Sequence, residues 1–103
     1  MNKTPDEEAY WNLVDDFIGR ANEACDQADP SVVSAALVQA AARFGAFVVA
    51  ASSLDRKEYT DEMESALEFL TKQYREHLRT DLEDYRENYK VYIVKERPEP
   101  SDD

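Results

Sequence analysis

The sequence predicts an all-α fold, and three observations carry the prediction. The chain has 103 residues but only two glycines and four prolines, and the prolines stand at positions 5, 30, 98 and 100, outside the long segments between them. Those segments are rich in Ala, Leu, Glu, Lys and Arg, which favour helix. Their apolar residues recur every three or four positions, which is the spacing of one face of a helix.

The predicted organisation is a single three-helix domain over residues 1–90, followed by a C-terminal extension and acidic tail over 91–103. The helices are expected at about 5–28, 30–52 and 60–89. A short connection makes the first two an antiparallel hairpin. The long third helix is expected to complete a helical bundle as a dimer.

The first helix has a clear start and one apolar stripe. Thr4 can cap it, Pro5 suits its first position, and Glu7 completes a capping box three residues after Thr4. The stripe to be buried consists of Tyr10, Leu13, Val14, Phe17, Ile18, Ala21, Cys25 and Ala28.

The second helix follows almost at once, with Asp29 as the expected N-cap and Pro30 in its first turn. It is apolar nearly all round, because Gln39 and Arg43 are the only long polar side chains between residues 33 and 52. One face carries large groups, and the other is made mostly of small residues that would let a further helix approach closely. The interface residues expected on that face are Ala42, Gly45, Ala46 and Val49.

Such a helix must be buried in protein or in lipid. A membrane span is disfavoured, because Arg43 near its centre costs about 2.5–3.5 kcal/mol or more and alanine offsets little of that. We therefore expect a soluble protein in which a second copy of the chain covers the small-residue face, since most soluble oligomers are symmetric dimers.

The third helix is expected to start at a Thr60 cap and to outreach the hairpin, at ~45 Å against ~30 Å for the second helix. Its overhang carries Tyr85 and Tyr89, which would rest on a partner subunit. Residues 91–94 are expected to be a short extended docking piece. The stripe of this helix is Met63, Leu67, Leu70, Tyr74, Leu78, Leu82, Tyr85 and Tyr89.

The net charge of −11 is unevenly spread. Residues 1–30 hold eight acids against two bases, whereas residues 55–97 hold twelve acids and nine bases. Direct nucleic-acid binding is not expected, because phosphate contacts need a basic patch. The single cysteine and the absence of a basic-then-apolar leader predict a cytoplasmic protein.

Arg43 leaves two interpretations open. If buried, its charge needs a partner, because arginine cannot lose its proton. The first interpretation is a structural ion pair with Asp81 or Asp84 of the third helix. The second is an anion anchor between helices, formed by Arg43 and Gln39 with Tyr74 or Tyr85 nearby.

No catalytic residue, metal site or cofactor is expected. His77 is the only histidine, and the di-iron motif Glu-x-x-His fails because Tyr74 stands three residues before it. Cys25 lies on the apolar stripe and is expected to be plain core. An enzyme is therefore the less favoured class.

The chain resembles a small family of uncharacterised bacterial proteins, mainly proteobacterial, that contain a domain of unknown function. The resemblance covers about residues 10–90 and rests on residues 33–37, Ala42-Arg43-Phe44 and Ala46-Phe47, and on Tyr74, Leu78, Leu82, Asp84-Tyr85 and Asn88. Gly45 departs from the polar residue expected after Arg43-Phe44. The resemblance implies a bacterial origin and assigns no activity.

Three functions remain in consideration. The favoured one is a non-enzymatic helical homodimer that serves as a scaffold or protein-interaction module. The second is an acidic adaptor that binds a basic protein through residues 1–30 and the tail. The third is a small-anion-binding protein that uses Arg43.

Overall fold

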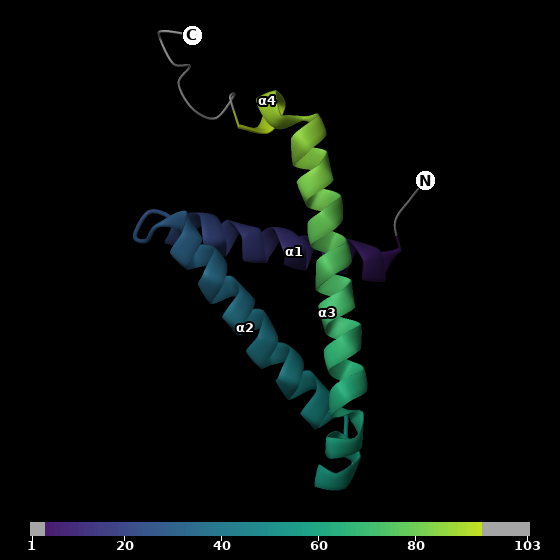
Figure 1. The fold of residues 1–103 in the computed structure, drawn as a ribbon. Coiled ribbons are helices and arrows are strands. Elements are labelled where there is room, and N and C mark those ends of the chain that lie inside the picture. Colours follow the sequence, from purple (N-terminus) through teal and green to yellow (C-terminus); the bar gives the residue numbers. More distant parts are fainter. Residues whose placement is uncertain (1–3, 94–103) are drawn as a thin grey trace, which may run out of the picture. The chain divides into compact units, whose positions relative to one another are not determined.

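A computed structural model describes residues 4–93 of the chain. Within this range the protein is helical, without strands, and consists of α1 (Pro5–Ala24), α2 (Pro30–Ala51), α3 (Arg56–Glu87) and α4 (Tyr89–Tyr92) (Figure 1). The all-α prediction is confirmed. The acidic tail expected at the C-terminus lies outside the described residues.

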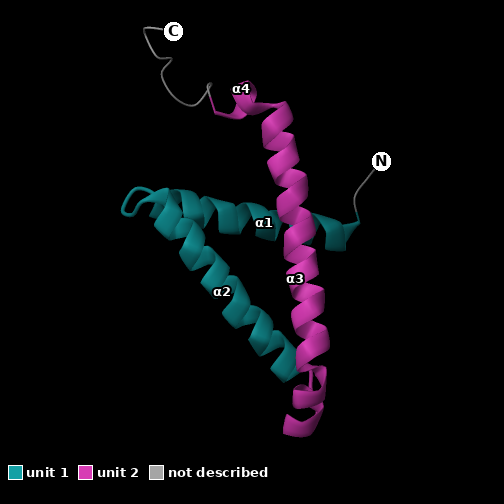
Figure 2. Ribbon diagram, viewed as in Figure 1, with its two compact units in different colours: residues 1–51 teal, residues 52–103 magenta. Residues whose placement is uncertain are grey.

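The chain divides into two compact units, residues 1–51 and 52–103 (Figure 2). The first unit contains α1 and α2, and the second contains α3 and α4. The prediction of a single domain over residues 1–90 concerns the packing of one unit on the other and stays a prediction.

The start of α1 is fixed by the predicted capping box. Thr4 Oγ1 accepts a hydrogen bond from the Glu7 backbone N–H at 3.1 Å, and Glu7 Oε1 accepts one from the Thr4 N–H at 3.3 Å. Two of the amides that a helix start leaves without a partner are thereby satisfied. Asp6, Glu7 and Glu8 also place negative charge where the helix dipole is positive.

The connection between α1 and α2 is short, as expected, but α1 ends at Ala24 rather than near residue 28. Residues 25–28 form turns instead. Asp29 then accepts hydrogen bonds from the Ser31 amide at 2.9 Å and the Ser31 hydroxyl at 2.7 Å, which confirms its predicted capping role. From this connection the two helices diverge, so that most of α2 lies away from α1 (Figure 1).

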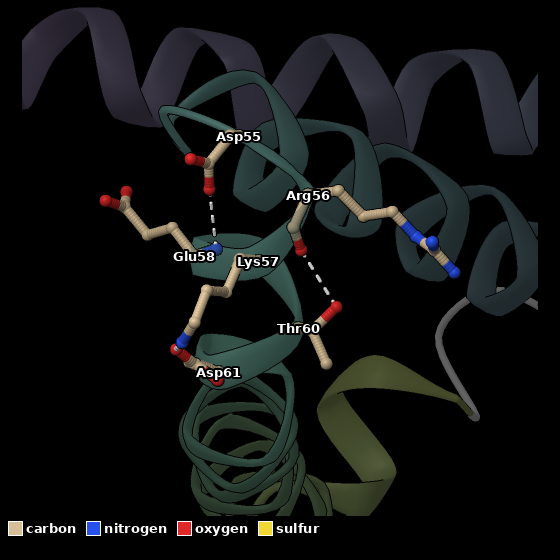
Figure 3. Close-up of polar contacts among 6 residues, drawn as sticks. All are labelled: Asp55, Arg56, Lys57, Glu58, Thr60 and Asp61. Atoms are coloured by element: carbon tan, nitrogen blue, oxygen red, sulfur yellow. Dashed lines mark hydrogen bonds and ion pairs between the residues drawn. The ribbon is translucent and has the colours of Figure 1, made fainter.

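The start of α3 differs from the prediction. Asp55, not Thr60, is the N-cap, and its carboxylate accepts a hydrogen bond from the Glu58 amide at 2.9 Å (Figure 3). The Glu58 side chain reaches back to the Leu54 amide at 3.1 Å. Thr60 lies one turn inside the helix and donates its hydroxyl to the Arg56 carbonyl at 2.8 Å.

α3 ends where Asn88 leaves helical geometry, with φ −120° and ψ 30°. The Asn88 amide side chain donates to the Asp84 carbonyl and carboxylate, at 3.2 Å and 2.9 Å. The chain then makes the single turn of α4, so the extended piece expected at residues 91–94 is wrong for the part that the structure describes.

We expect Asp55→Ala to fray the first turn of α3 and to lower the free energy of unfolding by about 1 kcal/mol, the usual cost of losing an N-cap. Urea unfolding followed by circular dichroism measures this change. Asp61→Ala is the matched control, because it removes only the exposed pair with Lys57 at 3.1 Å and should cost ~0.3–0.5 kcal/mol. Equal losses for both variants would contradict the capping role of Asp55.

The Asp29 cap should also be visible in the pH dependence of stability. The amide and hydroxyl of Ser31 donate to Asp29 and lower the pKa of its carboxyl below the ordinary value of 3.8. A lowered pKa in the folded state stabilises the protein above the unfolded value and is lost as the pH falls through the folded one. Asp29→Asn should therefore flatten the acid limb of the stability curve below about pH 4, and Ser31→Ala, which removes the hydroxyl donor and leaves the amide donor, should flatten it less.

Candidate interaction surface

No residue between positions 4 and 93 is buried, and many large apolar side chains are exposed. Taking one unit away could only increase the exposure of the side chains of the other. Neither unit therefore has a buried core of its own. Helices of 20 to 32 residues in water owe most of their stability to a covered apolar face. The exposed faces are therefore the candidate functional feature of this protein.

The α2 surface is apolar nearly all round, and its own unit leaves it exposed. Phe44 and Phe47, which are 65% and 61% exposed, lie on it with ring centroids 5.8 Å apart. The proposed small-residue face, Ala42, Gly45, Ala46 and Val49, belongs to the same helix. Because α1 diverges from α2, its own unit leaves this surface largely uncovered (Figure 1).

Arg43 is exposed on α2, one turn after Gln39. An exposed guanidinium is solvated and needs no partner, so the burial that motivated an ion pair is absent within the first unit. The predicted pair with Asp81 or Asp84, and the anion anchor with Tyr74 and Tyr85, would both join the two units. Both therefore stay predictions.

The α3 surface carries the predicted stripe of large apolar side chains. Leu67 and Leu82 are 60% and 61% exposed. A shallow hollow lies on the same helix and combines two leucines with three arginines and one acid. It is lined by Arg75, Leu78, Arg79, Leu82, Glu83 and Arg86.

The hollow was missed by the sequence analysis, although its signal is readable. Arg75 and Arg79 are four residues apart, as are Leu78 and Leu82, so both pairs recur on neighbouring lines of the helix. The total charge of residues 55–97 conceals the pattern, because twelve acids and nine bases nearly cancel there. The angular position of each charged residue around the helix axis shows that these arginines lie beside the leucines of the stripe.

The C-terminal end of the second unit is held by aromatic and polar contacts. The Tyr85 and Tyr92 rings lie with centroids 4.6 Å apart, and the Tyr92 hydroxyl donates to the Asp84 carboxylate at 2.9 Å. The charge of Asp84 and this hydrogen bond raise the pKa of the Tyr92 phenol. Of the tyrosines proposed for a dimer interface, Tyr85 is thus partly engaged by its own chain, and Tyr89 remains 53% exposed.

The described range 4–93 was expected to hold no metal site, and this concerns its His, Cys, Asp and Glu side chains. Within it, no group of three or more His, Cys, Asp or Glu side chains could hold a metal ion. Cys25 caps the end of α1 and is exposed, which corrects its predicted place in a core. The reason is that the first unit buries no residue at all.

α2 is also long and apolar enough to cross a membrane by length and composition, with a mean hydropathy of 1.8. The core helix of a soluble protein meets the same test. The expectation that α2 does not span a membrane rests on Arg43 and stays a prediction.

Fold and surface together define an all-α protein whose apolar helical faces are left exposed by their own units. Residues 10–86 match the family described as "Protein of unknown function (DUF3144)". The match covers most of the chain, which therefore belongs to this family, and the resemblance to a family of unknown function is confirmed. No curated protein and no solved structure matches the chain.

We expect the contact between Tyr92 and Asp84 to weaken as the pH rises. A phenol whose pKa is raised in the folded state stabilises α4 below the unfolded pKa, and this contribution disappears as the pH passes the folded one. Asp84→Asn should move the Tyr92 pKa back toward its ordinary value, as measured by NMR titration of the tyrosine ring carbons. Glu83→Gln is the control, and a Tyr92 pKa unchanged by Asp84→Asn would contradict the assignment.

Proposed function

We propose that this protein is a non-enzymatic, homo-oligomeric helical scaffold whose structural unit is a dimer. The observation that carries the proposal is the absence of any buried residue in the described range 4–93, set against the apolar surface of α2 and α3. Covering that surface is a requirement for a stable fold, and a second copy of the chain is the partner always present at the site of synthesis.

The free energy gained by burying apolar side chains supports this proposal. Fully burying one Val, Leu, Ile, Phe or Met side chain stabilises by about 1.5–3 kcal/mol. More than twenty large apolar residues are exposed in this chain, whereas a domain of ordinary size has a net stability of only about 5–15 kcal/mol. Even if a partner covers only part of α2 and α3, the stabilisation from that burial therefore exceeds the net stability of an ordinary domain.

The chemistry of the surface favours association over catalysis. In the described range, the large apolar areas lie on helix faces and not in enclosed clefts. Apolar helical faces bind other helices by packing side chains between one another. A scaffold or protein-interaction module uses such faces directly.

The decisive experiment is native mass spectrometry over a concentration series, with sedimentation velocity as a second measurement. We expect a dimer, and Leu67→Asp should raise its dissociation constant by about a hundredfold or more, because it places a carboxylate in the covered face. Leu54→Asp is the matched control. Leu54 is 89% exposed and lies in the α2–α3 connection, off the stripe, so this change should leave the dimer intact.

A wild-type chain that stays monomeric and folded would overturn the proposal. It would show that the two units of one chain cover each other. A chain recovered only in the membrane fraction, or extracted only by detergent, would also overturn it and would assign α2 to lipid.

A further inference from the structure

We propose that α3 is the pairing surface of the dimer and that two copies of α3 pack antiparallel, centred near residue 72. The proposal rests on the proposed function, since it specifies which face a second copy covers and in which direction. It comes from three features of α3 itself: the length of its apolar stripe, the arginine-rimmed hollow, and the order of charges along one flank.

The stripe is long and nearly straight. From Met63 to Leu82 it steps 63, 67, 70, 74, 78 and 82, which is closer to the 3.67-residue period of an 11-residue repeat than to a heptad. At about 100° per residue, these six residues lie within a sector of about 120°, so the stripe drifts around the helix but stays within one half of its surface. Two such stripes can therefore pack over most of the 32 residues of α3.

The apolar residues match in antiparallel order. Pairing Leu70 with the partner's Tyr74 also brings Leu67 against the partner's Leu78. The next pair outward, Met63 with the partner's Leu82, shares the midpoint of the Leu67–Leu78 pair between residues 72 and 73, and the Leu70–Tyr74 midpoint lies at residue 72. A single register thus aligns the whole stripe.

The charges on one flank favour a register within one residue of that of the apolar pairs. Successive residues rotate by about 100° about the axis, so Glu64, Glu68, Arg75 and Arg79 fall on the same side of the stripe. In an antiparallel pair related by a two-fold axis, equivalent flanks face each other. Glu68 then meets the partner's Arg75, and Glu64 meets the partner's Arg79, with midpoints between residues 71 and 72.

These four charges are available for such contacts. Among residues 4–93, neither ion pair of the structure involves them: the pairs are Lys57 with Asp61 and Arg86 with Glu87. Arg75 and Arg79 line the hollow beside Leu78 and Leu82, where a partner's carboxylates would be partly shielded from water. Charge pairs flanking an apolar seam set partner orientation in helical assemblies.

A parallel pair is disfavoured by the same sequence. Residues 58–68 contain five acids and no base, and parallel packing places this segment against its own copy. Like charges at such spacing are destabilising. The antiparallel pair leaves two unfavourable approaches, between Glu62 and the partner's Asp84 and between Lys57 and the partner's Arg86. In each, a charge is already engaged within its own chain: Asp84 accepts hydrogen bonds from Asn88 and Tyr92, and Lys57 and Arg86 pair with Asp61 and Glu87.

The test uses two charge-reversal variants of the full chain. One, E64R/E68R, makes the flank entirely basic, and the other, R75E/R79E, makes it entirely acidic. Each variant alone should raise the homodimer dissociation constant about tenfold or more, because four attractive contacts become repulsive. Mixed in equal amounts, the two should form mainly heterodimers, in which every flank contact is attractive again.

Two controls separate pairing from other effects. The fourfold swap E64R/E68R/R75E/R79E restores opposite charges in the antiparallel register and should recover the homodimer. The variant E23R/E76R changes the net charge as E64R/E68R does, but at positions opposite the apolar stripes of α1 and α3 and outside the hollow, and should leave the dimer unchanged. Sedimentation equilibrium and native mass spectrometry at low salt measure all five proteins.

Direction is read from disulfide formation in a Cys25→Ser background. Met63→Cys in the basic variant and Leu82→Cys in the acidic variant should cross-link on mild oxidation, whereas Met63→Cys in both should not. The opposite pattern would overturn the antiparallel arrangement.

The two proposals fail differently. A monomeric wild type refutes the scaffold dimer itself. A dimeric wild type whose charge variants all dimerise as tightly, with no excess of heterodimer on mixing, refutes only the α3 pairing and places the interface on α2.

Discussion

The apolar surface of α2 and α3 is the constraint on which the rest of this structure depends. α1 and α2 are joined by a short turn and diverge from it, so neither can surround the other (Figure 1). Among the described residues of the second unit, 52–93, α4 is the helix packed against α3. A helix gains most of its stability from a covered face, so α2 and α3 each depend on cover from outside their own unit.

The parts of the fold that depend on near neighbours could be predicted from the sequence. The capping box of Thr4 and Glu7 and the cap at Asp29 involve residues two or three positions apart, and the structure contains them. The start of α3 was misread because two capping residues stand close together there. Asp55 has Glu58 three residues later, whereas Thr60 has Met63, so the full motif favoured Asp55 from the outset.

The candidate surface was only partly predictable. Helical spacing is a local property, and it identified the α3 stripe and the all-round apolar α2. The state of Arg43 depends on what covers α2, which is a contact between segments far apart in sequence or between chains. Cys25 shows the same difficulty: its place on an apolar stripe predicted burial, but no packed core exists in the first unit to bury it.

The distribution of charge gives the final reason for placing association on the second unit. Two copies of a chain with a net charge of −11 repel each other, and the first thirty residues contribute most of that excess. Nine of the twelve basic residues lie between positions 55 and 97. Several opposite-charge contacts between two copies can therefore form only if α3 lies in the interface. α2, with Arg43 alone, can add apolar area to an assembly but little that selects its direction.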